Sequence, residues 1–185
     1  MSILNEFAAR NRSFATSFDG GEIPALPKLG TMILTCVDAR VDPAHVLGLQ
    51  LGEAVVFRNN GGRVTQAFID EVAALAMLVA HRTGMDEASF GIVLMQHTQC
   101  GAQAFADPNF RDLIEERIGI DVSPSAVFDP AHDLLVDIER LRDARTLPGS
   151  LRVAALLYDV ETGVAGEIAP ERPLADLRGE GAGFV

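Results

Sequence analysis

Two cysteines and one histidine stand directly after apolar runs that have the composition of buried strands. Cys36 follows the run Met32-Ile33-Leu34-Thr35, and His97 and Cys100 follow the run Ile92-Val93-Leu94-Met95. Because open α/β sheets carry their functional groups at the carboxyl ends of parallel strands, these side chains are expected to meet at one edge of a sheet. Two thiolates and one imidazole are a ligand set that zinc takes in catalytic sites, with a fourth position left open. The sequence therefore predicts a metal centre.

A metal-free interpretation of the same residues stays open at this point. His97 would then be a hydrogen-bonded core histidine, and Cys36 and Cys100 would be small packing residues. They are the only cysteines in the chain. In a cytosolic protein, metal binding, catalysis or burial is expected of such a pair before a disulfide. The position of both thiols in polar clusters after strands favours the metal.

Asp38 and Arg40 are two residues apart on an extended segment, so their side chains leave the same face. Arg40 can hold the carboxylate through a bidentate contact, which leaves the metal open to water. Alternatively, Asp38 is a fourth ligand that closes the site. We therefore hypothesise a switch between the two arrangements with pH.

The composition describes a protein that acts on something small. The chain has 185 residues, enough for one domain (1–185) with its own core, and 48% of them are hydrophobic. The formal net charge is −11 and Lys28 is the only lysine, which argues against nucleic acid or an anionic membrane as partner. No apolar run approaches the roughly 20 residues of a membrane span. The first residues lack the pattern of a secretory signal, so a cytoplasmic location is expected.

Hydrophobic periodicity and turn residues predict an α/β fold with a mostly parallel central sheet flanked by helices. Four parallel strands are expected at 31–36, 54–57, 90–96 and 153–158, with a short fifth strand at 164–168. Helices are expected at 43–47, 65–82, 110–118 and 131–142, and another beginning at Gly101. An N-terminal helical arm (1–18) and an irregular tail (170–185) complete the domain.

Three features of these helices follow from their patterns. The helix 65–82 is apolar on most sides, which favours burial between the sheet and a partner chain. In the helix 131–142 the inward residues are expected to be Leu134, Leu135, Ile138 and Leu141. The remaining histidines are interpreted as structural or solvated, and they are His45, His81 and His132.

Three motifs in order make the sequence similar to the β-class carbonic anhydrases. They are Cys36-Val37-Asp38-Ala39-Arg40, Arg58-Asn59-Asn60-Gly61-Gly62 and His97-Thr98-Gln99-Cys100-Gly101. The resemblance covers residues 31–105 closely. It departs at Asn60, where alanine is common in the family, and at Gln99. Each motif is weak alone, and the three together at strand ends are specific.

The resemblance implies reversible hydration of carbon dioxide to bicarbonate and a proton by attack of zinc-bound hydroxide. Cys36, His97 and Cys100 would hold one Zn²⁺ per chain, and Asp38 with Arg40 would be the catalytic pair. A substrate pocket at Asn60, Gly61 and Gly101 and a homodimer or dimer of dimers are also implied. Two alternatives remain open: a carbonyl sulfide or carbon disulfide hydrolase on the same zinc scaffold, and a non-catalytic zinc-binding homologue.

Overall fold

A five-stranded sheet in the order β2-β1-β3-β4-β5 forms the centre of the computed structural model, which describes residues 2–20 and 23–179. Its strands are β1 (Thr31–Cys36), β2 (Ala54–Asn59), β3 (Gly91–His97), β4 (Arg152–Tyr158) and β5 (Ala165–Pro173). The first four are parallel to their neighbours, and β5 runs antiparallel to β4. This arrangement confirms the predicted mostly parallel α/β sheet. Its register brings the carboxyl ends of β1, β2 and β3 to one edge.

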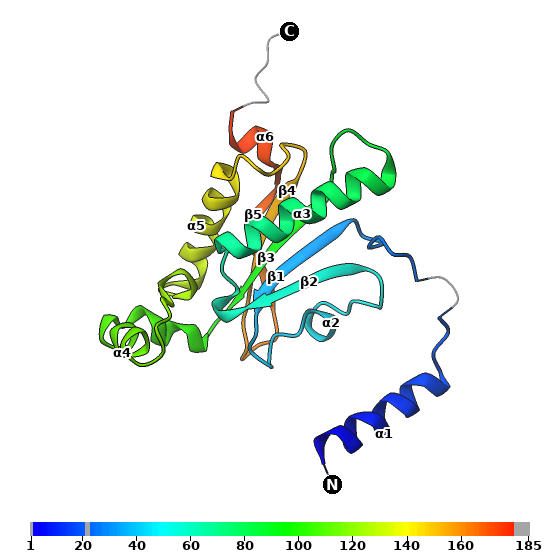
Figure 1. Cartoon of the computed structure of the whole chain (residues 1–185), viewed down its shortest axis with the longest axis horizontal. Helices are drawn as coiled ribbons and strands as arrows, with labels where there is room; N and C mark the ends of the chain where they lie inside the picture. Colours follow the sequence, from blue (N-terminus) through cyan, green and yellow to red (C-terminus); the bar gives the residue numbers. More distant parts are fainter. Residues whose placement is uncertain (1, 21–22, 180–185) are drawn as a thin grey trace.

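Two long helices, α3 and α5, cover one face of the sheet (Figure 1). The helices are α1 (Ile3–Thr16), α2 (Pro43–Val46), α3 (Gln66–Thr83), α4 (Pro108–Ile118), α5 (Pro130–Asp143) and α6 (Leu174–Leu177), and the 3₁₀ segments are η1 (Asn60–Gly62), η2 (Gly101–Ala106) and η3 (Ser123–Ser125). Local chemistry sets their starts, because the side chains of Asp42, Thr65 and Asp129 accept N-terminal amide hydrogens of α2, α3 and α5.

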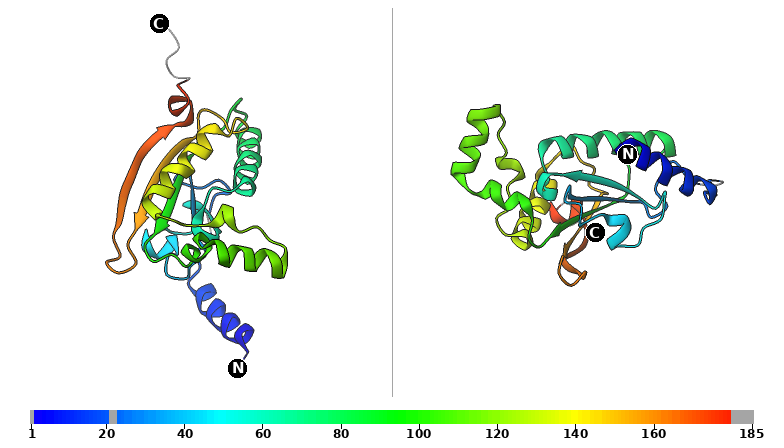
Figure 2. Two further views of the ribbon diagram at one scale, coloured as in Figure 1. Left: turned by 90° about the vertical axis from the view of Figure 1, so that its left-hand side faces the viewer. Right: turned by 90° about the horizontal axis from the view of Figure 1, so that it is seen from below.

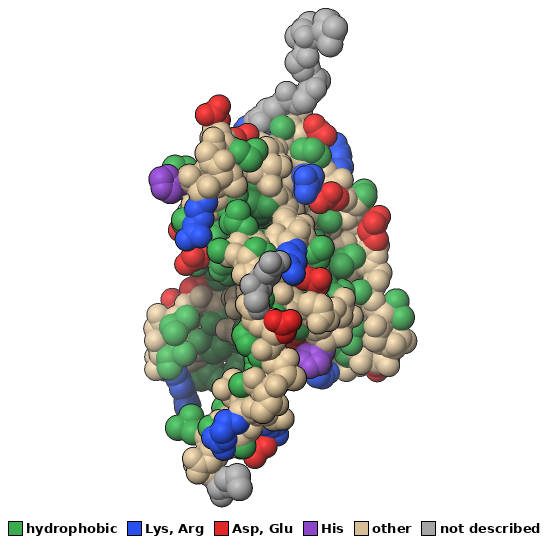
Figure 3. All heavy atoms as spheres, turned by 90° about the vertical axis from the view of Figure 1, so that its right-hand side faces the viewer, with side chains coloured by type: hydrophobic (Ala, Val, Ile, Leu, Met, Phe, Trp, Pro, Cys, Tyr) green, Lys and Arg blue, Asp and Glu red, His purple; other side chains and the backbone are tan. Residues whose placement is uncertain are grey.

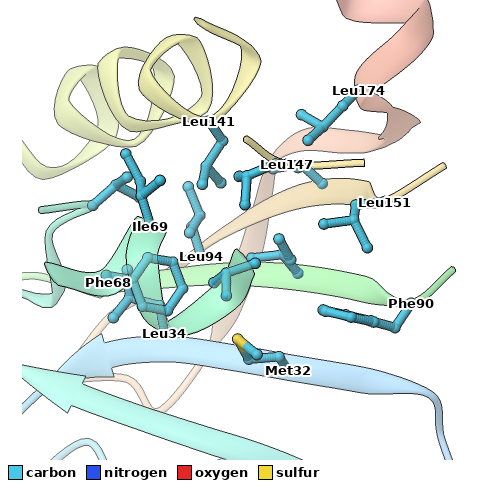
Figure 4. Close-up of a cluster of buried hydrophobic side chains, with 14 of the residues drawn as sticks. Met32, Leu34, Phe68, Ile69, Phe90, Leu94, Leu141, Leu147, Leu151 and Leu174 are labelled. Atoms are coloured by element: carbon cyan, nitrogen blue, oxygen red, sulfur yellow. The ribbon is translucent and has the colours of Figure 1, made fainter. Parts of the chain in front are cut away.

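The main core lies between the sheet and these two helices (Figure 4). Leu34 of β1 and Leu94 of β3 are fully buried against Phe68 of α3 and Leu141 of α5. Burial of each such side chain stabilises the fold by about 1.5–3 kcal/mol. The core therefore anchors β1 and β3, the two strands whose ends carry the predicted ligands.

Helix α5 faces the core with the predicted residues except Leu135, and Ile138 is partly buried against that core. Leu134 and Leu141 are fully buried as expected, but Leu135 is 46% exposed. Asp133 and Asp137 are buried in its place. Carboxylates are rarely buried unless they have a partner, and the partner here is an arginine far away in the sequence. The prediction for Leu135 was therefore wrong.

The end of the chain is more regular than predicted. Strand β5 extends to Pro173 instead of ending near residue 168, and α6 follows directly, so residues 170–177 are not an irregular tail. Pairing with β4 extends the strand, and Leu174 is fully buried with its N–H donating to the carbonyl of Leu151. Residues 180–185 of the predicted tail lie outside the described residues.

The expected helix at Gly101 is a 3₁₀ segment of six residues, η2, and the α-helix α4 begins only at Pro108. Helix α4 starts there because Asp107 is its N-cap and Pro108 occupies the first helical position. The backbone after Cys100 therefore does not present the N-terminus of an α-helix.

Helix α1 stands away from the rest of the chain (Figures 1 and 2). None of its residues is buried, and Leu4 and Phe7 are 73% and 56% exposed. The outer face of α3 is also open in the single chain, with Met77 74% exposed. In Figure 3, hydrophobic side chains gather in a hollow of the surface above the N-terminal helix.

Among residues 2–20 and 23–179, no helix combines the length and apolar character that a membrane span requires.

Candidate metal centre

The carboxyl ends of β1 and β3 deliver three potential ligands to one point. Cys36 is the last residue of β1, His97 is the last residue of β3, and Cys100 follows after a turn. Gln99 makes that turn in the left-handed conformation, with φ 54°. One ligand atom from each of Cys36, His97 and Cys100 lies within 4.8 Å of the others, and all three residues are buried.

The donor atoms of this cluster fit a zinc ion. The two sulfur atoms are 3.8 Å apart and both thiols are free. His97 Nδ1 lies 2.8 Å from the Thr98 carbonyl oxygen, whereas His97 Nε2 is buried without a hydrogen-bond partner among the described residues. A proton on Nδ1 leaves the Nε2 lone pair free, which is how metal-binding histidines are usually oriented. A buried nitrogen beside two thiols is therefore available to a metal.

The two thiols behave as one proton-sharing pair. A hydrogen bond from Cys100 lowers the pKa of Cys36 to about 4, assisted by His97 and by backbone hydrogen bonds from Asp38 and Gly61. The same contact raises the pKa of Cys100, and burial adds to that rise. Cys36 is thus the more acidic member of the pair, and the titration belongs to the pair.

Asp38 and Arg40 form the bidentate pair that the open arrangement requires. Arg40 Nε and Nη2 donate to Asp38 Oδ1 and Oδ2 at 3.0 and 2.7 Å, and the Arg40 backbone N–H also donates to Oδ1 at 2.9 Å. Arg40 Nη2 reaches the Gln99 carbonyl at 3.0 Å. The guanidinium hydrogen bonds hold the pKa of Asp38 well below its usual range, so the carboxylate stays ionised.

A second arginine, whose role sequence reasoning missed, fixes the backbone beside the ligands. Arg58 Nε donates to the Cys36 carbonyl at 3.0 Å, and Arg58 Nη2 donates to the Asp38 carbonyl at 2.7 Å. Its place at the end of β2, beside β1, was the available signal, because the register pairs Thr35 with Arg58. This contact ties the loop 36–38 to the neighbouring strand.

A small cavity of about 200 Å³ opens onto the cluster. Its lining includes the three predicted pocket residues, Asn60, Gly61 and Gly101, together with Cys36 and Asp38. It also includes three residues that the sequence analysis did not single out, namely Val37, Ala102 and Phe105. Substrate contact by these residues stays a prediction.

Other parts of the described chain offer less chemistry. A larger cavity of about 360 Å³ lies at the opposite end of the sheet, and none of its lining residues is a cysteine, histidine or carboxylate. His45, His81 and His132 are exposed and lie outside the metal cluster, as expected. The small cavity beside Cys36 is the candidate site because it opens onto the cluster of Cys36, His97 and Cys100.

Comparisons with known proteins agree on one family. The family model described as carbonic anhydrase matches residues 31–119. The chain is 30% identical to a protein named Beta-carbonic anhydrase 1 from Mycobacterium tuberculosis, over 92% of this chain and 100% of the relative. A carbon disulfide hydrolase from Acidianus is 28% identical over 70% of this chain and 72% of the relative. The crystal structure of carbonic anhydrase from Streptococcus mutans superposes with a TM-score of 0.73 at 30% identity, covering 91% of this chain and 98% of that one.

Proposed function

The chain belongs to the β-carbonic anhydrases, a family of zinc lyases, and we propose that it catalyses the reversible hydration of carbon dioxide to bicarbonate and a proton. The observation that carries the proposal is the convergence of Cys36, His97 and Cys100 next to an Asp38 carboxylate held by Arg40. One zinc ion per chain, held by Cys36, His97 and Cys100, would supply the chemistry by acidifying a water molecule near neutral pH.

The residues around the ligands each have a role in this proposal. Arg40 donates twice to Asp38 Oδ1 but only once to Oδ2, so Oδ2 keeps capacity to accept a hydrogen bond from the attacking water. It therefore acts as an orienting acceptor. Arg58 donates to the carbonyls of both Cys36 and Asp38, which fixes the backbone between the two residues. The Thr98 carbonyl holds the His97 ring through Nδ1, so that Nε2 would be free to bind zinc.

The size and lining of the cavity support a small, uncharged substrate. Val37, Ala102 and Phe105 provide apolar walls in a space of about 200 Å³. Carbon dioxide needs little desolvation to enter such a space. Bicarbonate, which carries charge, is favoured to leave toward water.

The competing activity is hydrolysis of carbon disulfide or carbonyl sulfide. This activity is supported by a relative named carbon disulfide hydrolase that matches 70% of this chain, and by the polar Asn60 in the cavity lining. The fuller coverage of a relative named for carbonic anhydrase favours carbon dioxide. A zinc-binding homologue without catalysis is the remaining alternative.

We also propose that the protein is a homodimer, or a dimer of dimers, in the cytoplasm. The proposal is supported by the apolar residues of α1, since Ile3, Leu4 and Phe7 are 63%, 73% and 56% exposed and have no place in their own core. Contiguous apolar surface of this kind is typical of interfaces. The cytoplasm is favoured because the metal needs both thiols reduced.

The test is stopped-flow hydration of carbon dioxide on protein whose zinc content is measured in the same sample. Fast hydration with about one zinc per chain, lost in Cys100→Ser and retained in His81→Ala, is the expected result. His81 is an exposed histidine on α3 and serves as the matched control. Full zinc occupancy with hydrolysis of carbonyl sulfide alone would replace the proposed substrate. Absence of zinc from folded wild-type protein would overturn the proposal.

A further inference from the structure

A buried ion cluster lies behind the wall of the candidate site. Arg63 is 3% exposed and pairs with Asp137 through Nε–Oδ2 and Nη2–Oδ1 contacts of 2.8 and 3.2 Å. Arg63 Nη1 lies 3.2 Å from Asp133 Oδ1, and both carboxylates are almost completely buried. Arg140 adds a second cation, with its Nη1 2.9 Å from Asp137 Oδ1. None of these residues has a role in the mechanism proposed above.

The cluster connects α5 to two other segments of the chain. Arg63 Nη1 donates to the Ala126 carbonyl, and Asp133 Oδ2 accepts the Phe128 N–H at 2.7 Å. At its other end, the Arg63 backbone is bracketed by the Asn59 side chain, through N–Oδ1 and O–Nδ2 contacts of 2.9 and 2.8 Å. Arg63 thus joins the end of η1 to the segment 123–129, which contains η3 and the loop that follows it.

These two segments are in close contact at the cavity wall. A Cβ built on Gly61 would lie 2.6 Å from the Ser125 carbonyl oxygen and 3.0 Å from Val127 Cγ2. The Val127 N–H donates to the Ala102 carbonyl at 3.2 Å. Gly61 and Ala102 both line the candidate cavity. The position of the loop 125–127 therefore determines the position of both wall residues.

Gly61 and Ala102 also contact the metal ligands. Ala102 packs in one buried cluster with Cys36 and Cys100, and the backbone N–H groups of Gly61 and Ala102 act to lower the pKa of Cys36 and of Cys100, respectively. Such N–H donors to sulfur set the orientation and electron density of a thiolate ligand. A continuous path of contacts accordingly runs from Arg63 through the loop 125–127 to these donors.

We propose that Arg63, together with Asp133 and Asp137, is a positioning residue that holds the Gly61 and Ala102 amides against the two cysteine ligands. The inference rests on the proposed metal site, but not on the choice of substrate. A buried ion cluster is a poor device for stability alone, because apolar residues of similar volume often stabilise as well or better. The rigid, bidentate geometry of the guanidinium suits a positioning role.

The experiment compares Arg63→Lys and Asp137→Asn with Leu141→Ala, a core variant one turn further along α5. Each protein is loaded with Co²⁺, and three quantities are recorded: the thiolate-to-cobalt charge-transfer spectrum, the metal affinity against a competing chelator, and the midpoint of unfolding. The zinc forms are assayed for kcat/KM. For Arg63→Lys and Asp137→Asn we expect a shifted charge-transfer band and a loss of about 10- to 100-fold in metal affinity or kcat/KM. Leu141→Ala is expected to lower the unfolding midpoint and leave the band and kcat/KM unchanged.

An unchanged band, affinity and kcat/KM in folded Arg63→Lys would overturn the inference. If Arg63→Lys does not fold, Asp133→Asn provides the test, because it removes one charge and keeps the shape of the side chain. Absence of carbon dioxide hydration by zinc-loaded wild type contradicts the proposed function instead, and the cobalt spectra and affinities then still decide the role of Arg63.

Discussion

Arg40 engages both oxygens of the Asp38 carboxylate, with Nε–Oδ1 and Nη2–Oδ2 distances of 3.0 and 2.7 Å. Arg40 thereby holds the carboxylate. The cluster of potential ligands consists of Cys36, His97 and Cys100, and Asp38 is not part of it. The described geometry corresponds to the open arrangement of the candidate metal centre.

Replacing Arg40 by glutamine is expected to lower kcat/KM for carbon dioxide hydration by about 100-fold with zinc retained, since a positioned hydrogen-bonding group contributes roughly that much. The guanidinium depresses the pKa of Asp38, so the carboxylate is ionised in the wild type down to strongly acidic pH. Without Arg40 that pKa returns toward its ordinary value, so an additional loss of activity is expected at acidic pH, below the near-neutral titration of the water that zinc would activate. Stopped-flow assays across pH measure both effects.

The control for this variant is Arg142→Gln, which removes a similar pair with Asp143. Arg142 Nε and Nη2 lie 2.8 and 3.2 Å from the Asp143 oxygens, on an exposed part of α5. Its kcat/KM and pH profile should match the wild type. Equal kcat/KM and an equal loss of activity at acidic pH in Arg40→Gln and wild type contradict the assigned role.

Removal of the metal should expose the shared proton of the two cysteines. Because the contact with Cys100 lowers the pKa of Cys36 to about 4, metal-free protein is expected to contain one thiolate from mildly acidic pH upward. The second thiol should ionise only at alkaline pH, since the same contact raises the pKa of Cys100. Ultraviolet absorbance of the thiolate during a pH titration measures this, and Cys100→Ser should raise the first midpoint. Two simultaneous ionisations in metal-free wild type would contradict the prediction.

Gly61→Ala is expected to destabilise the fold and to impair the site. Gly61 has φ 76°, which costs an L-residue about 1–2 kcal/mol, and the added methyl group would lie 2.6 Å from a backbone oxygen. The clash adds about 1–3 kcal/mol. Gly163→Ala is the matched control, because Gly163 has φ 74° and open space around its Cβ position. Denaturant unfolding should show the larger loss of stability for Gly61→Ala, and equal losses would argue against the close contact.

Asn60→Ala tests the polar lining of the cavity. Removing the amide makes the wall apolar, so kcat/KM for carbon dioxide is expected to rise by no more than about tenfold, as for other single pocket groups. Paired assays with carbon dioxide and carbonyl sulfide measure the preference. A shift of that preference toward carbonyl sulfide would indicate that Asn60 selects against sulfur.

Leu4→Asp tests the apolar face of α1. Leu4 is 73% exposed in the single chain, so a charge there should weaken association of two copies with little effect on the fold. Ser13→Asp places the same charge on the opposite side of the helix and should leave the mass unchanged. Light scattering at a fixed protein concentration gives the mass. A wild-type mass equal to one chain would rule out the proposed dimer.

Much of the architecture was readable from local patterns. Apolar runs located the strands β1 to β4, and the caps Asp42 and Thr65 located the starts of α2 and α3, because burial and capping are decided within a few residues. The residue types and order of the three motifs indicated the family. That Cys36 and His97 lie at the same edge of the sheet was expected because each follows a parallel strand, whereas the pairing of β1 with β3 came from the structure.

Only the tertiary structure decided which side chains hold the site in place. Asp133 and Asp137 look like solvent-facing residues of α5, and their burial depends on Arg63, which is 74 residues from Asp137 in the sequence. The choice between a ligating Asp38 and one held by Arg40 likewise depends on distances that no spacing specifies. Whether a charged side chain is buried depends on the partners that the fold brings to it. Local periodicity does not specify those partners.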